Sequence, residues 1–369
     1  MTRISALVGA FGLGFLPSAV TPAAAQVAAP IVMAQGLDNP RGLAFGPDGV
    51  LYVVEAGRGG NSALCLPNPG GAPGTRCYGP SGAVTRIASA GVQQRVLIGL
   101  PSLAGPTGAE ATGPHDLAFG LGLALITVGS GGDPALLTPL KTAGITQFGS
   151  LLSVSPTGVV TTLLDVSAYE TANNPAGGPI DSNLFGLELQ TQAPARALIA
   201  DAGANALLQV DANLVISTLA TFPTRQVPGP GGGPVDMEAV PTSTARGPDG
   251  SIYIGELTGF PFPVGGARVY RVPANGGTPV VVATDFTNII DIAVGADGSA
   301  YVLEHDVNGL LQPGSVGRLT KIGPFGARTE LAAGLLVAPG KIAIGDDNAV
   351  YVTTNSNAAG TGQVLKIAQ

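Results

Sequence analysis

The sequence predicts an all-β chain folded as a six-bladed β-propeller, and three observations lead to this prediction. One fragment recurs six times, and each copy is followed by further strand-like elements. One copy of the last element stands at the N-terminus instead of at the end of the final unit. The composition agrees, because 56 Gly and 31 Pro beside 45 % apolar residues are typical of a packed chain of short strands and turns.

The recurring fragment predicts a pair of strands joined by a tight turn. Its first copy reads GLAFGPDGVLYVVEAG (Gly42 to Gly57), and the others begin at Asp116, Gly186, Ser243, Asp291 and Lys341. Gly-Pro-Asp-Gly is a turn signal, since Gly and Asp tolerate positive φ. The run Leu51 to Val54 is apolar on both faces, which is expected of a strand packed between two neighbouring sheets.

Two more strands complete each unit. The second recurring element begins at Gly82, Gly149, Asn205, Ala267, Gly317 and Gly362, and the third begins at Arg95, Val159, Val215, Pro279 and Thr329. The first and last copies of the fragment are 299 residues apart, from Tyr52 to Tyr351, over five steps. That spacing of about 60 residues fits a four-stranded propeller blade with long loops.

The missing sixth copy of the third element, PIVMAQGL from Pro30, precedes the first unit. A closed ring must join its ends, because terminal strand edges would otherwise stay unpaired. We therefore expect the strand Ile31–Gln35 to pair outside Gly362–Ile367 and to complete the last blade, in one domain covering residues 26–369. An open β-solenoid is the alternative, and it has no need of this displaced strand.

The N-terminus has the pattern of a cleaved signal peptide. A basic start is followed by an apolar stretch, Ile4 to Leu16, and by a small-residue cleavage pattern at Ala23 to Ala25. We expect residues 1–25 to be removed and the protein to be periplasmic or extracellular. Later apolar runs are too short to span a bilayer. In an exported chain, Cys65 and Cys77 predict a disulfide that closes a short loop, since two thiols without a nearby His are too few for structural zinc.

The acidic charge excludes one class of partner. The formal net charge is −7, and loss of Arg3 with the signal peptide would make it −8. Nucleic acid is therefore not an expected partner. The sequence also has no G-x-S-x-G, H-E-x-x-H or G-x-x-x-x-G-K motif.

An acidic residue ends the second strand of four units. These residues are Glu55, Asp201, Glu256 and Glu304, with Gly129 and Thr354 at the two remaining positions. A feature repeated once per blade favours an architectural role, in which each carboxylate accepts hydrogen bonds within its own blade. The alternative is a ring of ligands for a hard cation such as Ca²⁺.

The segments that lead into the first strands differ between units and are the better site candidates. They are expected to bring six polar residues around the axis on one face: Arg41, His115, Asp116, Asp181, Asn183 and Asp291. His115 could act as a general base or metal ligand, or it could simply bond the neighbouring backbone. On the same face, Phe260 and Phe262 could line the pocket of an aromatic ligand or pack on their own blade.

At these residues the chain resembles the ScyD/ScyE family of exported propeller proteins, and its blade strings resemble NHL-type repeats. The matching stretches are LDNPRGLAFGPDG from Leu37, ATGPHDLAFG from Ala111, AYETANNPAGG from Ala168 and GELTGFPFPVGGARVYRV from Gly255. The resemblance covers about Ile31 to Ile367. It implies an exported six-bladed propeller of NHL/SMP-30-like type, accessory to secondary-metabolite (scytonemin-like) biosynthesis.

Two functions follow as hypotheses. The first is a binding protein that holds a small or aromatic ligand, or a protein partner, on the shared face through Arg41, His115, Asp116, Asn183, Phe260 and Phe262. The second is a Ca²⁺-dependent lactonase or hydrolase of the SMP-30/gluconolactonase-like type. Its metal ligands would be Asp116, Asp181, Asn183 and Asp291, and His115 would be its catalytic base. The second rests on fold-level analogy.

Overall fold

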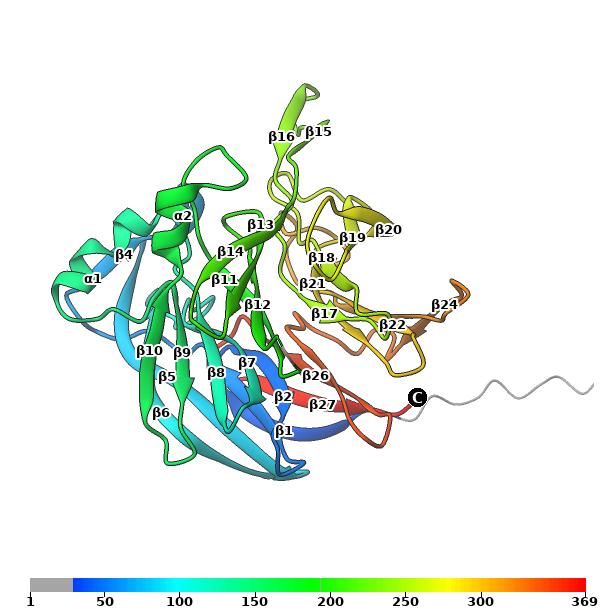
Figure 1. Cartoon of the computed structure of the whole chain (residues 1–369), viewed down its shortest axis with the longest axis horizontal. Coiled ribbons are helices and arrows are strands. Elements are labelled where there is room, and N and C mark those ends of the chain that lie inside the picture. Colours follow the sequence, from blue (N-terminus) through cyan, green and yellow to red (C-terminus); the bar gives the residue numbers. More distant parts are fainter. Residues whose placement is uncertain (1–28, 193) are drawn as a thin grey trace, which may run out of the picture.

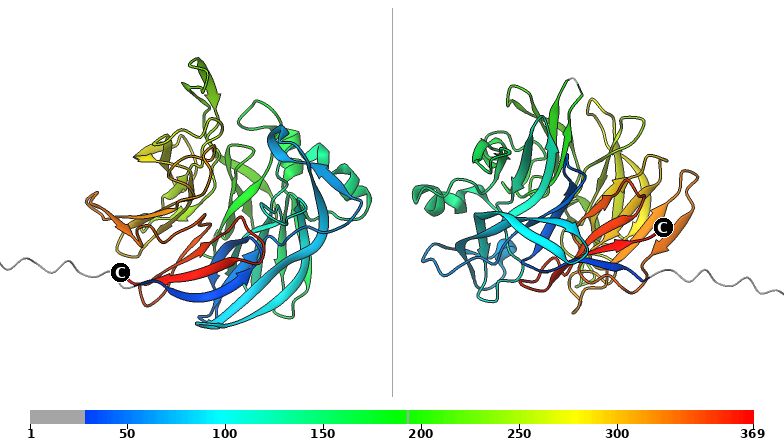
Figure 2. Two further views of the ribbon diagram at one scale, coloured as in Figure 1. Left: turned by 180° about the vertical axis from the view of Figure 1, so that it is seen from behind. Right: turned by 90° about the horizontal axis from the view of Figure 1, so that it is seen from below.

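The fold is a ring of six antiparallel sheets in a computed structural model that describes residues 29–192 and 194–369. The predicted signal peptide, residues 1–25, lies outside the described residues. The blades follow one another around the ring in sequence order, as the colours of the right panel of Figure 2 show. The prediction of a six-bladed β-propeller is confirmed.

Blades 1 to 3 each contribute four main strands. From the axis outward these are β2 (Pro40–Phe45), β3 (Leu51–Glu55), β5 (Thr75–Ser89) and β6 (Val92–Ala104) in blade 1; β7 (Pro114–Gly120), β8 (Leu123–Val128), β9 (Ser150–Val154) and β10 (Val160–Asp165) in blade 2; and β11 (Leu184–Gln190), β12 (Arg196–Asp201), β13 (Ala206–Asp211) and β14 (Ile216–Thr221) in blade 3.

Blades 4 to 6 repeat the pattern. From the axis outward their strands are β17 (Ala245–Arg246), β18 (Ile252–Gly255), β19 (Ala267–Val272) and β20 (Val280–Phe286) in blade 4; β21 (Ile289–Val294), β22 (Ala300–Glu304), β23 (Arg318–Ile322) and β24 (Arg328–Leu331) in blade 5; and β25 (Ile342–Ile344), β26 (Val350–Thr354), β27 (Gly362–Ile367) and β1 (Ile31–Leu37) in blade 6.

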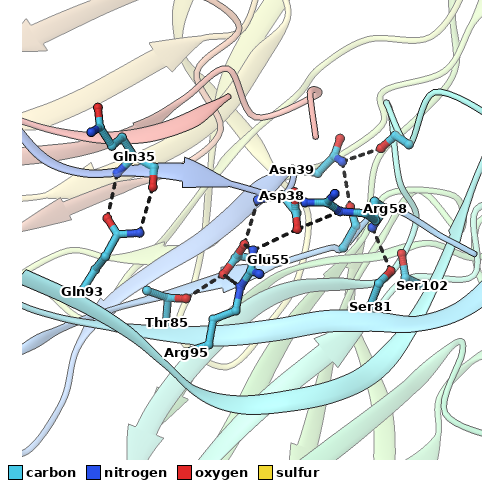
Figure 3. Close-up of polar contacts among 12 residues, drawn as sticks. Gln35, Asp38, Asn39, Glu55, Arg58, Ser81, Thr85, Gln93, Arg95 and Ser102 are labelled. Atoms are coloured by element: carbon cyan, nitrogen blue, oxygen red, sulfur yellow. Dashed lines mark hydrogen bonds and ion pairs between the residues drawn. The ribbon is translucent and has the colours of Figure 1, made fainter. Parts of the chain in front are cut away.

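The ring closes where the sequence predicts. β1 pairs antiparallel with β27, with Val32 opposite Leu365, so the N-terminal strand completes the last blade. The side chain of Gln93 in β6 also hydrogen-bonds the backbone of Gln35 in β1 in both directions, at 2.8 Å each, and so links blade 1 to blade 6 (Figure 3). β27 thus has a strand on each side at the junction, which leaves the edge of the last C-terminal strand paired.

The core lies between the blades, because each sheet is covered on both faces. Leu51, Val53 and Val54 of β3 are 3 %, 0 % and 0 % exposed, as the doubly apolar run predicts. The Gly-Pro-Asp-Gly segment forms the expected tight turn, in which Gly46 N–H donates to the carbonyl of Val50 and Gly49 has a φ of 70°. Turn chemistry and two-sided burial together specify the β2–β3 pair.

The additions to the blades all lie on one face, which we call the top face. It carries the connections between blades and the loops between second and third strands, and the added elements are visible in Figure 1. These elements are β4 (Cys65–Pro67), the 3₁₀ turns Pro69–Gly71 and Pro134–Leu137, α1 (Thr138–Thr142), α2 (Ser167–Asn173), β15 (Arg225–Pro228) and β16 (Pro234–Met237).

Two sequence features fall in these top-face additions. Cys65 and Cys77 form the predicted disulfide, and they are directly opposite one another in the β4–β5 pair. Gly231 to Gly233 lie in the loop of the β15–β16 hairpin, which projects from the ring in Figure 1. Among the described residues, no helix is both long enough and apolar enough to cross a membrane.

Candidate functional site

The acid at the end of β3 is enclosed by donors from its own blade. Glu55 is fully buried and accepts hydrogen bonds from the Asp38 backbone N–H at 2.7 Å and from the Thr85 hydroxyl at 2.6 Å. Arg95 binds both of its carboxylate oxygens, at 3.0 and 2.6 Å. Figure 3 shows Thr85 and Arg95 reaching Glu55 from β5 and β6. Such a carboxylate has no free acceptor for a metal or a substrate.

The three equivalent acids are enclosed in the same way, and all are fully buried. Asp201 accepts from Asn183 N–H at 2.7 Å and from the Ser182 hydroxyl, while Glu304 accepts from Thr287 N–H at 2.7 Å and from Arg318. Glu256 is paired with Arg225 at 2.6 Å. These bonds fasten the segment leading into each blade, or a neighbouring Arg, to the second strand. The repeated carboxylates are therefore part of the blade architecture.

Asp116 and Asp291 lie on the innermost strands of blades 2 and 5, where the ammonium of Lys341 joins them. Lys341 Nζ is 2.6 Å from Asp116 Oδ2 and 3.1 Å from Asp291 Oδ1. Asp116 also accepts from Leu187 N–H of β11, and Asp291 from Ile342 N–H of β25. A side chain at Gly42 would lie 2.6 Å from the Asp116 backbone, so glycine is needed there. This ion triad links four innermost strands.

Burial and the neighbouring opposite charges shift the pKa values of the triad in opposite directions. Burial raises the pKa of Asp291 to about 6, and the nearby ammonium only partly opposes that shift. Burial alone would lower the pKa of Lys341, but the two carboxylates outweigh it and raise that pKa. Lys341 therefore stays charged. A lysine ammonium already fills the place between these two carboxylates that a metal cation would need.

The other two predicted metal ligands have different partners. The carboxyl of Asp181 is half-buried near Asp201, Glu238 and Asp133, and partial burial with these like charges raises its pKa to about 6. Asn183 Oδ1 accepts from Gly131 N–H at 3.1 Å. No group of three His, Cys, Asp or Glu side chains suited to a metal occurs within residues 29–192 and 194–369. The donor set that we predicted from the sequence thus does not fit a Ca²⁺ ion here.

Blade 2 differs from its neighbours at the end of its second strand. Gly129 occupies the position of the missing acid, and a side chain there would lie 2.4 Å from both Asn183 Oδ1 and the His115 ring. The imidazole and the amide thus occupy the space that a strand-end carboxylate fills in other blades. Blade 2 therefore lacks the repeated strand-end acid at the place occupied by His115, one of the two histidines in the sequence.

His115 is held as a neutral imidazole with a defined tautomer. It is 5 % exposed, and its Nδ1 lies 2.8 Å from the carbonyl of Leu184, which can only accept a hydrogen bond. Nδ1 therefore carries the proton. Burial, together with the charge of Arg41, lowers the pKa of His115 to about 3. The remaining lone pair belongs to Nε2, and the ring packs against Phe185 with centroids 4.7 Å apart.

Arg41, at the top end of β2, is half-buried with an enclosed Nε, and it has few hydrogen-bond partners. Among the described residues, its side chain has one hydrogen bond, from Nη2 to the carbonyl of Ala111 at 3.3 Å, and its buried Nε has no partner. Burial lowers its pKa to about 10, a shift that Glu110 partly opposes. Arg76 is the contrasting case, because it is 3 % exposed and donates to four oxygens, those of Pro67, Thr112, Ser130 and Gly131.

We call Arg41, His115, Asn183 and Phe185 the axial cluster. Its members lie at or just before the top ends of β2, β7 and β11, the innermost strands of three successive blades. The second histidine, His305, is also near Arg41, whose charge helps burial to lower the pKa of that imidazole. His305 Nδ1 bonds the carbonyl of Pro339 at 2.8 Å. The cluster thus combines a cationic donor, an imidazole acceptor and an aromatic ring.

The predicted candidates fall into separate groups. The structure gathers Arg41, His115 and Asn183, and it places Asp116 and Asp291 in the triad instead. Sequence reasoning missed Phe185 and Lys341. Phe185 lies in β11 and Lys341 just before β25, and they align in sequence with predicted residues, Phe185 with His115 and Lys341 with Asp116. Aligning the six first strands position by position was the signal that could have found them.

The two phenylalanines of the Gly-Phe-Pro-Phe-Pro loop contact each other. Their ring centroids are 6.5 Å apart and nearly perpendicular, and Phe260 is 51 % exposed. The loop follows β18 on the top face and packs beside Glu238 and Gly309. It therefore borders the top face of blade 4 rather than forming part of the axial cluster.

An apolar groove lies on the opposite face. It has a volume of about 850 Å³ and lies between blades 1 and 2, where Phe45, Tyr52, Phe119 and Leu121 contribute apolar walls. Its rim carboxylate, Asp48, is already bonded to Tyr52 and Arg86. The groove offers apolar surface without a free charged group. It therefore lacks the hydrogen-bonding groups that the axial cluster has.

Comparison with known proteins shows the fold. No protein-family model matches the chain, and no curated protein sequence matches it significantly. Solved structures do match over most of its length, and this likeness shows the propeller fold.

Three of these structures have a TM-score of 0.50. A calcium-binding regucalcin from Agrobacterium tumefaciens is 15 % identical and covers 93 % of this chain and 94 % of its own. An auxiliary nutrient binding protein from Bacteroides thetaiotaomicron is 12 % identical, over 90 % and 69 %. A gluconolactonase from Xanthomonas campestris is 9 % identical, over 95 % and 99 %. At these identities the likeness shows architecture, and function must be argued from the site.

Proposed function

We propose that this protein is an exported binding protein that holds a small molecule on the top face of the propeller, over the axial cluster. The observation that carries the proposal is the unfilled hydrogen-bonding capacity of Arg41, whose Nε is buried without a partner. A buried donor left unpaired costs about 1–3 kcal/mol, so a ligand that pairs with it recovers that free energy on binding. The charge of Arg41 acts on the ring of His115, whose Nε2 adds an acceptor to the same cluster.

The Ca²⁺-dependent hydrolase hypothesis receives less support from the same residues. Asp116 and Asp291 are neutralised by Lys341, and Asp181 lies instead near the carboxyls of Asp201, Glu238 and Asp133. His115 also has a pKa of about 3, which is far from the value near 7 that suits a general base. The axial cluster is therefore better suited to binding than to proton transfer.

Two features support the export and the accessory role that belong to this proposal. The Cys65–Cys77 disulfide agrees with an oxidising compartment outside the cytoplasm. The resemblance to the ScyD/ScyE family, carried by the stretches from Leu37 and Ala111, favours an accessory role in the biosynthesis of a secondary metabolite.

Chemical-shift mapping of the ¹⁵N-labelled mature protein against a small-molecule library tests the proposal. We expect compounds that bind to shift the amides of Ala111, Leu184 and Phe185 and the His115 ring. Hits that shift only the amides of the bottom groove, or a library without any hit, would contradict a top-face binding function.

A further inference from the structure

The chemistry of the axial cluster also indicates what its ligand looks like, an inference that rests on the proposed function. We propose that the ligand is an organic carboxylate with a neighbouring hydroxyl or amine, whose carboxylate pairs with Arg41 while the hydroxyl or amine donates to His115 Nε2.

The carboxylate follows from the state of Arg41. A guanidinium offers five N–H donors and no acceptor, and here a single hydrogen bond of 3.3 Å uses one of them. Other arginines near the top face, such as Arg95 and Arg225, are paired with buried acids at 2.6 Å. Arg41 forms no ion pair with any carboxylate of residues 29–192 and 194–369. The charge of Glu110 acts on Arg41 without a direct bond, and a planar carboxylate matches the geometry of the guanidinium and supplies a directly bonded counter-charge.

The donor group follows from the tautomer of His115. Because Nδ1–H is bound to the Leu184 carbonyl, Nε2 can only accept, and a ligand must therefore bring an N–H or O–H to it. The tautomer is fixed by the backbone. A ligand with a carboxylate alone would satisfy Arg41 but would leave the imidazole lone pair unused.

Phe185 is the apolar member of the axial cluster, and it suits a ligand with an aromatic or other flat apolar group. Phe185 is partly exposed and packs against the His115 ring with an angle of 44° between the planes. A flat ring that continues this stack gains contact area and retains its polar groups at one edge. Mandelate combines a carboxylate, an adjacent hydroxyl and a phenyl ring, and it serves as the probe.

Three ligands separate the contributions. Mandelate has both polar groups, phenylacetate lacks the hydroxyl, and mandelamide replaces the carboxylate by a neutral amide of similar shape. A hydrogen bond to a charged group is worth about 1.5–3 kcal/mol, so we expect mandelamide to bind about 10- to 100-fold more weakly than mandelate. We expect a smaller loss, of about 3- to 10-fold, for phenylacetate.

Variants locate the effect. Arg41→Met should remove the preference for mandelate over mandelamide, whereas Arg58→Met, an equal loss of charge at a 54 % exposed top-face arginine, should preserve it. His115→Gln should abolish the difference between mandelate and phenylacetate. Circular dichroism melting of each variant confirms that it is folded before its titration is interpreted.

The outcomes distinguish this inference from the proposed function. If mandelamide binds at the axial cluster as tightly as mandelate, the ligand class is wrong and the binding function stands. The same conclusion follows if inorganic phosphate displaces mandelate and binds as tightly, since the cluster would then recognise any anion. If neither mandelate nor mandelamide shifts the axial amides while library compounds do, the carboxylate assignment also fails. If no compound of any charge shifts them, both proposals fail.

Discussion

The carboxylate of Glu55 and the guanidinium of Arg41 lie at the same end of blade 1, yet their surroundings differ completely. Glu55 accepts four hydrogen bonds, and Arg41 donates a single long one. Glu55 is fully buried, whereas Arg41 is half-buried with an enclosed Nε, so the cost of burial is compensated at Glu55 and left uncompensated at Arg41 Nε. Polar groups that stabilise the fold have all their hydrogen-bond partners within the blades. A polar group with unused hydrogen-bonding capacity indicates a role in ligand binding.

The comparison extends around the ring. Three other strand-end acids are enclosed like Glu55, and the Asp116–Lys341–Asp291 triad joins the innermost strands across the axis. Blade 2 departs from this order, because Gly129 makes room for His115 and Asn183. Stability and ligand binding should therefore respond to different substitutions.

The largest effect is expected from Lys341→Met. This change leaves two buried carboxylates without a counter-charge, and breaking such a pair typically costs about 3–5 kcal/mol. The free energy of unfolding from urea titration at pH 7 measures the loss. An exposed pair provides the control, since Arg271→Met removes the partner of Asp249 at the surface and should cost less than about 1 kcal/mol.

The loss in Lys341→Met should depend on pH with a definite sign. Asp291 already has a folded pKa of about 6, above its ordinary 3.8, so its protonated form is favoured by folding. Stability from such a group is present at low pH and is lost as pH rises through the folded pKa. Without Lys341 the folded pKa rises further, and the deficit should shrink between pH 7 and pH 5. A deficit that is constant with pH would contradict the triad.

A smaller loss is expected from Glu55→Ala. The substitution removes the acceptor of the Asp38 N–H and of Thr85, while Arg95, which is 41 % exposed, can turn to solvent. We expect a destabilisation of about 3 kcal/mol, measured by urea unfolding. The library compounds that bind the top face should keep their affinity once the variant is folded. A stable Glu55→Ala variant with lost binding would reverse the roles that we assign.

Gly129→Ala should lower both the stability of the fold and the affinity for a ligand. An added methyl group would meet the His115 ring and Asn183 Oδ1 at 2.4 Å, and overpacking of this kind costs about 1–3 kcal/mol. Because the imidazole must move, binding over the axial cluster should weaken as well. Gly323→Ala, just after β23, is a matched control, since Gly323 also lacks a positive φ and an added methyl group there would meet its nearest atom, the Ala327 carbonyl oxygen, only at 3.8 Å. Equal binding by both variants would contradict the placement of His115.

Arg41→Met should have the smallest effect on stability, within about 1 kcal/mol of the wild type. Replacing a poorly paired buried charge by an apolar side chain of similar length is often neutral or stabilising. Calorimetric melting measures the change. A loss of more than about 2 kcal/mol would show that Arg41 supports the fold, as Arg76 does, and would remove the main argument for a ligand.

The sequence predicts the ring more fully than the site, for a physical reason. Val32 opposite Leu365 and the tight turn at Gly49 follow from local patterns of apolar and turn residues. The bond between Lys341 and Asp116 joins residues 225 positions apart, and no local pattern encodes it. The hairpin β15–β16 and the two helices also escaped prediction, because they interrupt the repeat in long top-face connections. His115 was found because it is rare, and its partner Phe185 was missed because phenylalanine in a strand is ordinary.

The most direct test of the account is the ¹⁵N chemical shift of the His115 ring followed from pH 8 to pH 5, with His305→Gln used to assign the two histidines. We predict one protonated nitrogen, Nδ1, and one unprotonated nitrogen, Nε2, throughout this range, because the pKa of His115 is about 3. A ring that titrates near its ordinary value of about 6.5, or that carries its proton on Nε2, would show that the free acceptor of the axial cluster does not exist.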